Sequence, residues 1–384
     1  MQRARPIYRL SAHPPSAHRR SAGGVPAVVS PTAPRLLADQ FGRVADDLRI
    51  SLIDKCNLRC TYCMPAEGME WLPTGDLLTA EEAVRLADIG VRTFGVKDIR
   101  FTGGEPLVRK DLADIIAGVR ELHPGVSIAL TTNALGLDKR IDSLVRAGLT
   151  RINVSLDTIR RDTFATITRR DRLDQVVSGI DAARRAGLAP IKVNAVMMRG
   201  LNDGQAPELL QWCLDRDLQL RFIEQMPLDA DRHWARENLV SAQEIRDSLA
   251  TRFDLSPHPA PRGSAPAQLW DVRRTTGADT AATNETTDTE VLGQVGIIAS
   301  VTESFCAACS RTRITADGKI RTCLFSQTET DLLGLLRGGA SDDEIADTWQ
   351  AAMWNKPRAY GSNEVTLNSP EYVQPERTMS AIGG

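Results

Sequence analysis

Short runs rich in β-branched and aliphatic residues alternate with helical patterns over most of the first 230 residues. Six such runs occur, at residues 48–53, 99–102, 126–132, 151–156, 191–197 and 218–223. Strands that alternate with helices at this spacing form right-handed βαβ units and a parallel sheet. Because six units are fewer than the eight of a closed barrel, the pattern predicts an α/β fold with an incomplete (β/α)6 barrel. In such a barrel the functional side chains lie at the C-terminal ends of the strands.

Two helix boundaries can be placed from residue type. Thr79 followed by Glu82 forms a capping box, which predicts the start of a helix after Thr79. The helix after the second strand is expected to begin near Asp111. It should end at His123-Pro124-Gly125, because proline and glycine interrupt helical hydrogen bonding there.

Composition divides the chain into three regions. Residues 1–38 hold six arginines and no acidic residue, and this composition predicts a disordered tail. A transit peptide has the same composition. The barrel is expected at 39–234 and a smaller C-terminal region at 235–384. Within that region, the Thr-rich and acidic segment 275–290 predicts a mobile surface loop.

The charge balance excludes two broad functions. Lys and Arg number 47 and Asp and Glu number 49, which leaves a formal net charge of −2. General binding to nucleic acid or to a membrane surface needs strong basic segregation, so neither partner is expected. The sequence also lacks the apolar run of about 18 residues that a transmembrane helix requires.

Seven cysteines occur, and six of them form two clusters of three. An odd number of cysteines in tight clusters is a poor disulfide framework and favours metal binding in a reducing compartment. The remaining one, Cys213, lies among Leu209, Leu210 and Trp212, where it is expected to pack as a small hydrophobic residue.

The first cluster follows the first predicted strand as Cys56-x3-Cys60-x2-Cys63. Three soft ligands without a neighbouring His or fourth Cys suit a 4Fe–4S cluster with one open iron better than a four-ligand zinc site. A zinc site completed by a distant histidine and unligated thiols are the alternatives.

The second cluster is Cys306-x2-Cys309-x13-Cys323, again without a neighbouring histidine. The same reasoning favours a second 4Fe–4S cluster with an unligated iron. The alternative is a zinc ribbon whose missing ligand is His258.

The first motif resembles the radical S-adenosylmethionine (SAM) superfamily, because Tyr62 precedes the last cysteine and the motif follows the first strand. The stretch Phe101-Thr102-Gly103-Gly104-Glu105-Pro106 at the end of the second strand strengthens this resemblance. In the superfamily that stretch contacts the methionyl part of SAM. Paired glycines suit such a role because they allow a close approach to the backbone.

The two cysteine triads, the segment Cys309–Arg313 and the terminal Gly383-Gly384 together resemble the GTP 3′,8-cyclase family of molybdenum-cofactor biosynthesis. The resemblance spans roughly residues 39–384. It implies that the first cluster cleaves SAM to a 5′-deoxyadenosyl radical, which takes the 3′ hydrogen of GTP. The C3′ radical then attacks C8 of guanine, and the product is (8S)-3′,8-cyclo-7,8-dihydro-GTP. The open iron of the second cluster would bind the guanine base.

Positions matching the family's ligand residues follow from the resemblance alone. For GTP they are Arg49, Arg100, Thr131, Lys192, Arg311, Thr312 and Arg313. For SAM they are Tyr62, Gly104, Ser155 and Met226. Arginine suits the triphosphate because its guanidinium group binds phosphate in a bidentate manner. One departure affects this site: Asp98, next to Lys97, stands where the family often has a lysine.

The resemblance also implies partners and a location. It implies an external electron donor and a separate synthase that converts the product to cyclic pyranopterin monophosphate, and it allows a homodimer. Because open clusters are oxygen-sensitive, the protein is expected in the cytoplasm, or in the mitochondrial matrix if the tail is a transit peptide. Two rival functions remain: a peptide-modifying radical SAM enzyme with an auxiliary cluster, and a zinc-stabilised binding protein.

Overall fold

The predicted parallel strands are all present in the computed structural model, which describes residues 35–275, 290–367 and 369–383. They pair side by side in chain order, each parallel to the next. Their bounds are β1 (Asp47–Ser51), β2 (Asp98–Thr102), β3 (Ser127–Thr132), β4 (Arg151–Ser155), β5 (Ile191–Met197) and β6 (Gln219–Glu224). The incomplete barrel is therefore confirmed.

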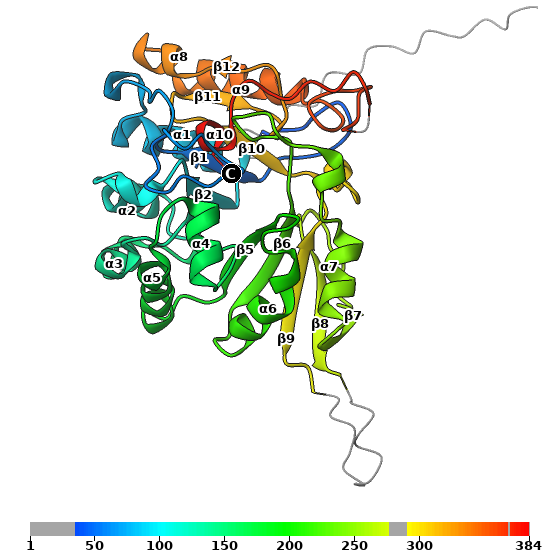
Figure 1. Ribbon diagram of the computed structural model, residues 1–384. Helices are drawn as coiled ribbons and strands as arrows, with labels where there is room; N and C mark the ends of the chain where they lie inside the picture. The colour runs from blue at the N-terminus through cyan, green and yellow to red at the C-terminus, as the bar shows by residue number, and fades with distance from the viewer. Residues whose placement is uncertain (1–34, 276–289, 368, 384) are drawn as a thin grey trace, which may run out of the picture. The chain divides into compact units, whose positions relative to one another are not determined.

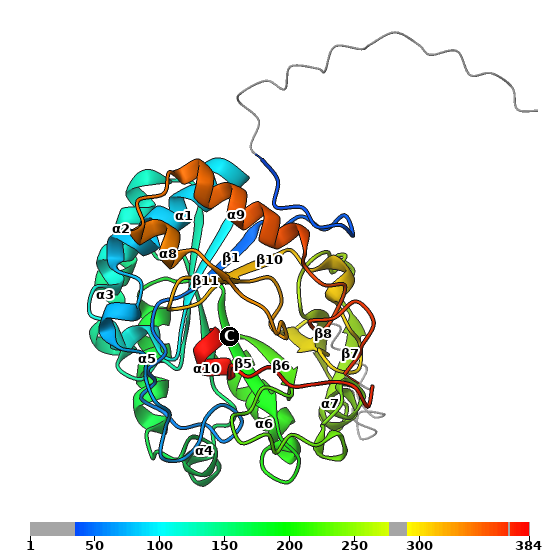
Figure 2. The ribbon, with the colours of Figure 1, turned by 90° about the horizontal axis from the view of Figure 1, so that it is seen from above.

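Helices connect these strands and cover the outer face of the sheet (Figures 1 and 2). They are α1 (Ala80–Phe94), α2 (Leu112–Leu122), α3 (Ile141–Ala147), α4 (Arg161–Thr168), α5 (Leu173–Arg185) and α6 (Ala206–Leu214). The predicted capping box is confirmed, since Thr79 accepts from the Glu82 backbone and Glu82 from the Thr79 backbone. The predicted end of α2 at His123 is also confirmed.

The C-terminal region extends the same sheet at both edges. At one edge β9 (Gly293–Ile298) lies parallel to β6, followed by antiparallel β8 (Gln268–Arg274) and β7 (Phe253–Pro257). At the other edge β10 (Arg311–Ile314) lies parallel to β1, followed by antiparallel β11 (Lys319–Arg321) and β12 (Thr330–Asp331). The second cysteine triad thus flanks the first strand, although the sequence suggested a separate smaller region. The boundary at residue 235 stays a prediction.

The remaining helices lie in this C-terminal region. They are α7 (Ala242–Leu249), α8 (Leu333–Arg337), α9 (Asp342–Trp354) and α10 (Met379–Ile382). Single 3-10 turns occur at η1 (Thr74–Asp76), η2 (Pro106–Val108), η3 (Leu137–Lys139), η4 (Asp203–Gln205), η5 (Arg236–Asn238) and η6 (Cys306–Ala308).

The described chain starts earlier than the predicted end of the tail. Leu37 is fully buried, and Arg35 Nη2 lies 2.5 Å from Asp347 Oδ1 of α9. Residues 35–38 therefore pack against the fold, because the apolar side chain of Leu37 is buried in the core. The extent of the tail stays a prediction. Residues 1–34 and most of the predicted loop, 276–289, lie outside the described residues.

The two faces of the barrel strands differ in chemistry. On the outer face Leu48, Ile50 and Phe101 are fully buried in the main hydrophobic core. Because side chains alternate along a strand, the residues between them point to the inner face. Those residues include Arg49 and Arg100, so the inner face carries charge that a purely structural parallel sheet would not bury.

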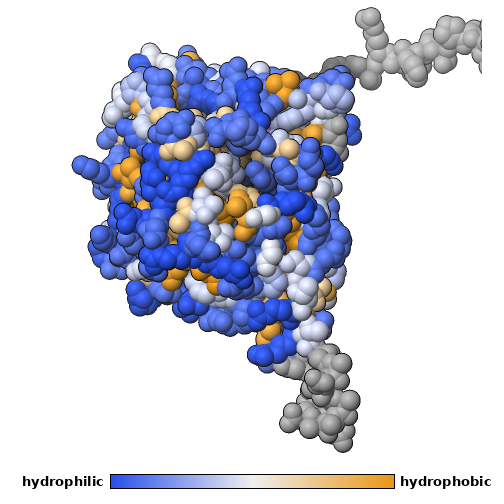
Figure 3. All heavy atoms as spheres, viewed as in Figure 1, coloured by the Kyte–Doolittle hydropathy of each residue, from blue (hydrophilic) through white to orange (hydrophobic). Residues whose placement is uncertain are grey.

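No helix in the described part of the chain is both long and apolar enough to cross a membrane. On the face drawn in Figure 3, hydrophilic residues dominate and hydrophobic residues appear in small groups. That face therefore offers no broad apolar surface.

Candidate functional site

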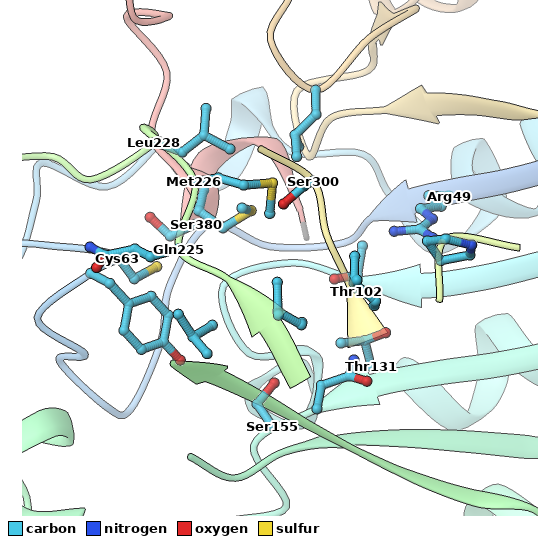
Figure 4. Close-up of a pocket in the computed structure, with 18 of the residues that line it drawn as sticks. Arg49, Cys63, Thr102, Thr131, Ser155, Gln225, Met226, Leu228, Ser300 and Ser380 are labelled. Atoms are coloured by element: carbon cyan, nitrogen blue, oxygen red, sulfur yellow. The ribbon is translucent and has the colours of Figure 1, made fainter. Parts of the chain in front are cut away.

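Both cysteine triads line one cavity at the C-terminal ends of the barrel strands. Figure 4 shows Arg49 on one side of this cavity and Cys63, Met226 and Ser380 on the other. Most of the ligand residues expected from the sequence line it: Arg49, Cys56, Cys60, Tyr62, Cys63, Arg100, Gly104, Thr131, Ser155, Met226, Cys306, Cys309, Arg311, Arg313 and Cys323. Residues that are far apart in the sequence thus form a single site.

Two expected ligand residues do not line the cavity. Thr312 alternates with its neighbours Arg311 and Arg313 on β10, so its side chain points to the outer face. There it is fully buried and its Oγ1 accepts a hydrogen bond from Trp349 Nε1 at 3.0 Å. The structure therefore does not support Thr312 as a side-chain ligand. Lys192 is the second residue of β5, whereas the cavity lies at the C-terminal ends of the strands.

The first triad lies on the loop that leaves β1. All three thiols are free and partly exposed. Burial raises the pKa of Cys56 to about 11 and that of Cys63 to about 12, which favours the protonated thiol at neutral pH. Metal binding would release these protons, as it does at other cysteine sites. Three free thiols that face one cavity fit a cluster with one open iron.

The glycine pair that follows β2 packs against this loop. A Cβ on Gly104 would lie 2.2 Å from the Asp54 carbonyl oxygen, and one on Gly103 would lie 2.4 Å from that of Ile53. The Gly104 N–H donates to the Ile53 carbonyl at 2.6 Å. The sequence analysis assigned the glycines to a close approach by a ligand. The cysteine loop packs against these glycines, and both also line the cavity. A contact between Gly104 and SAM stays a prediction.

Two side chains connect the strand ends beneath the first triad. Glu105 is buried and accepts hydrogen bonds from Thr132 Oγ1 at 2.6 Å and from the Asn133 N–H at 2.7 Å. Burial raises the pKa of Glu105 to about 7. Asn133 Nδ2 donates in turn to Cys56 Sγ at 3.8 Å and to Asn57 Oδ1 at 2.7 Å. The ends of β2 and β3 therefore help to position Cys56.

Tyr62 is held by a carboxylate that the sequence analysis missed. Its hydroxyl donates to Asp157 Oδ2 at 3.0 Å, and the other Asp157 oxygen accepts from the Val196 N–H at 2.8 Å. Burial raises the pKa of Asp157 to about 6. Asp157 lines the cavity two residues beyond Ser155, so its position after a predicted strand was the available signal.

The second triad differs electrostatically from the first. Burial would raise the pKa of Cys309, but the charges of Arg311 and Lys356 outweigh burial and lower the pKa to about 6. This thiol is therefore prepared to bind metal as a thiolate near neutral pH.

The zinc alternatives find no support in the geometry. His258 pairs with Asp271 Oδ1 at 2.7 Å on β8, and it does not line the cavity. Within the described ranges, no three His, Cys, Asp or Glu side chains gather closely enough for a single metal ion.

Three arginines form a row across the cavity wall. In the register of the sheet Arg313 of β10 pairs with Arg49 of β1, which pairs with Arg100 of β2. Burial lowers the pKa of Arg49 to about 9 and that of Arg100 to about 10; the charge of Asp47 opposes this shift, and repulsion from neighbouring arginines adds to it. Asp47 lies 3.8 Å from Arg49 and supplies one negative charge to this row of three arginines. An anion would therefore stabilise the row further.

Two arginines of this row, and Arg311 beside it on β10, also have unsatisfied hydrogen-bonding groups. Buried side-chain nitrogens of Arg49, Arg100 and Arg311 have no hydrogen-bond partner among the described residues. Unpaired buried donors cost free energy, which a polyanionic ligand would recover. The site is therefore built for an anion with several oxygens.

Sequence reasoning missed two further residues of the same wall. Arg221 of β6 and Asn194 of β5 are register neighbours and line the cavity. Each has a buried polar atom that finds no partner within the ranges that the structure describes. Burial and then the charge of Arg151 lower the pKa of Arg221 to about 10. The signal was the alternation of polar with apolar residues along these two strands.

The departure at Asp98 has a local explanation. Its carboxylate accepts a hydrogen bond from Arg151 of β4, so it neutralises one cation near the start of the strands. Lys97 pairs with Asp46 at 3.3 Å, and 76% of its side chain is exposed. Lys97 therefore does not replace the lysine that the resemblance expects.

The C-terminal segment reaches into the site. Met379 and Ser380 of α10 line the cavity, and α10 lies over the middle of the barrel in Figure 2. The Gly383 carbonyl accepts from Arg313 Nη1 at 3.1 Å. Gly383 has φ +82°, and its position beside Ser51 and Thr102 leaves little room for a side chain. Gly384 lies outside the described residues.

Family models match two consecutive parts of the chain. Residues 50–213 match the model of the radical SAM superfamily, and residues 218–362 match the model named Molybdenum Cofactor Synthesis C. These matches meet near the end of the six-stranded barrel. They assign the first triad to one model and the second triad to the other.

Relatives match nearly the whole chain. A GTP 3′,8-cyclase of Paenarthrobacter nicotinovorans is 58% identical over 91% of this chain and 97% of its own length. One from Mycolicibacterium smegmatis is 53% identical over 95% of this chain and 97% of its own. One from Streptomyces coelicolor is 53% identical over 91% and 96% respectively.

Among solved structures, the radical SAM fold recurs at low sequence identity. Streptococcus suis SuiB has a TM-score of 0.53 and 15% identity, covering 88% of this chain and 77% of SuiB. SuiB bound to S-adenosylmethionine has a TM-score of 0.52 and 17% identity, covering 77% of this chain and 66% of that chain. At this identity the likeness supports the fold alone.

Proposed function

The chain belongs to the GTP 3′,8-cyclase family of the radical SAM superfamily, and from this premise we propose how its cavity carries out the family's reaction. The enzyme converts GTP to (8S)-3′,8-cyclo-7,8-dihydro-GTP in molybdenum-cofactor biosynthesis. One observation carries the proposal: both cysteine triads and a row of undercompensated arginines line the same cavity. A radical formed at one triad can therefore meet a nucleotide held at the other.

The arginine row binds the triphosphate of GTP in this proposal. Arg49, Arg100 and Arg313 present guanidinium groups from adjacent strands, and Arg311 contributes from the same edge. Arg221 joins them from β6, because it lines the same cavity and its buried Nε has no hydrogen-bond partner in the described part of the chain. Bidentate contacts from several arginines orient a triphosphate and fix the ribose relative to the radical source. Thr131, whose hydroxyl is buried and unpartnered, is placed to bind a polar group of GTP.

The opposite side of the cavity binds SAM. Tyr62 is fixed by Asp157, and Gly104 by the cysteine loop. Ser155 and Met226 line the wall between the two. When bound to Cys56, Cys60 and Cys63, a 4Fe–4S cluster supplies the electron for reductive cleavage of SAM. The protein residues around it hold SAM and exclude water from the radical.

The second triad holds a second 4Fe–4S cluster in this proposal. Three observations support this proposal. The thiols of Cys306, Cys309 and Cys323 are free, all three residues line the same cavity, and the pKa of Cys309 is lowered. The iron without a cysteine ligand would bind the guanine base and keep C8 near C3′ of the ribose.

Partners and location belong to the same proposal. The enzyme needs an external electron donor, and a separate synthase takes its product to cyclic pyranopterin monophosphate. We also propose that two copies of the chain form a homodimer. We place the reaction in the cytoplasm, because open clusters require reducing conditions. The relatives named above come from bacteria, so a mitochondrial location gains no support from them.

A peptide-modifying radical SAM activity is not favoured. The likeness to SuiB is limited to the fold, whereas the GTP 3′,8-cyclases match at more than half of the aligned positions. A row of buried arginines also suits a triphosphate better than a neutral peptide.

An anaerobic assay tests the proposed function directly. Reconstituted protein is mixed with SAM, dithionite and either GTP, ATP or no nucleotide, and 5′-deoxyadenosine and cyclised nucleotide are quantified. We expect GTP to yield both products in equal amounts and ATP to yield no cyclised product. 5′-Deoxyadenosine formed without any response to GTP would contradict GTP as the substrate.

Loss of either β10 arginine should weaken binding of GTP far more than binding of SAM. A hydrogen bond to a charged group contributes about 1.5–3 kcal/mol, so R311A or R313A should raise the Kd of GTP by about 10- to 150-fold. Isothermal titration with each ligand measures the effect. R161A is the control, because Arg161 is a fully exposed residue of α4. Equal weakening of both ligands would place the triphosphate elsewhere.

Lys192 does not line the cavity, but its charge acts on Arg100 and Arg221, which do. We therefore propose that it adds to the positive potential felt by the triphosphate, and that binding of GTP weakens at alkaline pH as this charge is lost. Burial, followed by repulsion from Arg221 and Arg151, lowers the pKa of Lys192 to about 8. Above that pH the free protein has lost the charge, so binding of the triphosphate must take up a proton. The Kd of GTP should then rise by up to about tenfold per pH unit.

The variant K192R isolates this effect, because a guanidinium group keeps its charge over the same range. Titrations between pH 7 and pH 9.5 should give a flat Kd for K192R and a rising Kd for the natural chain. Parallel slopes in the two proteins would remove Lys192 from the triphosphate site.

A further inference from the structure

A buried lysine contacts a sulfur atom of the second triad. Lys356 follows α9, is only 2% exposed, and belongs to no ligand position that the family resemblance assigns. Its Nζ lies 3.4 Å from Cys309 Sγ. It also donates to the Cys309 carbonyl at 3.2 Å and to the Arg311 carbonyl at 2.7 Å.

These contacts use all the donors of an ammonium group. A charged lysine has three N–H donors and no acceptor, and here it meets three acceptors, two of them carbonyl oxygens. The geometry is therefore that of a positive charge held beside a cysteine ligand.

A neighbouring cation holds the same loop without touching sulfur. Arg43 donates to the Cys306 carbonyl at 2.9 Å and to the Pro357 carbonyl at 2.7 Å. Its charge is paired with Asp39 at 2.5 Å. Arg43 thus anchors the loop and the segment after α9. Lys356, by contrast, contacts two carbonyl oxygens and a sulfur atom, and no ion pair joins it to a carboxylate of the described residues.

We propose that Lys356 is a positioning residue of the second cluster, which holds Cys309 in place and makes that cluster easier to reduce. Hydrogen bonds to the sulfurs and nearby charge set the reduction potential of an iron–sulfur cluster. A positive charge stabilises the reduced, more negative state. The inference deepens the proposed function, since it rests on a cluster being bound at Cys306, Cys309 and Cys323.

The test compares K356M, K356R and K356Q with the natural chain. Methionine keeps the length of the side chain and removes the charge and the donors. Arginine keeps the charge, and glutamine keeps a neutral donor. Each reconstituted full-length protein is titrated reductively and followed by electron paramagnetic resonance. The first cluster, whose signal is the one that SAM changes, serves as an internal standard.

We expect K356M and K356Q to lower the midpoint potential of the second cluster and to leave the first unchanged. At a fixed potential the ratio of reduced to oxidised second cluster should fall about tenfold, which is about 59 mV for one electron. K356R should recover most of this shift. If K356M fails to retain the second cluster, K356Q carries the measurement.

A stability control separates positioning from mere folding. Ser341 caps the start of α9 and lies at the other end of that helix from Lys356. S341A should lower the melting temperature and leave both potentials unchanged. A K356M or K356Q protein that loses stability without a shift in potential would overturn the inference and leave the proposed function intact.

Iron content distinguishes failure of this inference from failure of the proposed function on which it rests. The natural chain should hold about eight irons, as two 4Fe–4S clusters require. About four irons in the natural chain would overturn the second cluster itself, and the inference with it.

Discussion

Replacing Cys60 with alanine should abolish cleavage of SAM. The site has three thiols for the first cluster and leaves one iron open, so removal of one thiol leaves too few ligands. We expect formation of 5′-deoxyadenosine to fall by more than about a hundredfold, since even outer-shell partners of metal ligands can cost that much. Anaerobic product analysis with dithionite measures it.

Two cysteine variants serve as comparisons for this prediction. C213A removes a thiol of α6 that is fully buried in the main hydrophobic core and does not line the cavity. This variant should keep both SAM cleavage and cyclisation of GTP. C323A should keep the first cluster and lose cyclised nucleotide, because Cys323 belongs to the second triad. Normal formation of 5′-deoxyadenosine by C60A would remove the first triad from the SAM site.

Adding a single methyl group at Gly104 should disrupt the first cluster almost as severely. The Cβ of G104A would lie 2.2 Å from the Asp54 carbonyl oxygen and 2.4 Å from that of Lys55. These are backbone atoms that cannot rotate away, so the cysteine loop itself must move. We expect the free energy of unfolding to fall by about 3 kcal/mol or more, which is the upper end of the range typical of overpacking. The iron content should fall by about half.

The control for this variant is G204A. Gly204 lies in η4, and an added Cβ there would meet nothing within 4 Å. G204A should keep its iron and its melting temperature. If G104A keeps a full complement of iron and cleaves SAM normally, then the close packing of this turn against the loop is not required for the cluster.

Much of the barrel could be predicted because its information is local. Each βα unit carries its own alternation of apolar runs, helical patterns and breakers, so the six strands were found to within one or two residues. The capping box at Thr79 and Glu82 depends on four consecutive residues and was equally clear. The cysteine triads were recognised for the same reason, since their spacing lies within short segments.

The rest of the site could not be predicted because it depends on pairing across the chain. β10 lies beside β1, although more than 250 residues separate them, and this pairing brings Arg313 next to Arg49. No local sequence pattern indicates which edge of the sheet a strand late in the chain will join. Lys356 illustrates the same limit, since a lysine after a helix usually remains solvated and here it contacts Cys309.

Local spacing by itself determined the barrel class, the two triads and, through resemblance, the reaction. The tertiary structure alone decided which side chains share a cavity and which point away from it. Thr312 shows the difference. Its neighbours Arg311 and Arg313 line the cavity, whereas Thr312 lies on the outer face and accepts a hydrogen bond from Trp349. The physical reason is that strand alternation and sheet register set direction, and both arise only when distant segments pair.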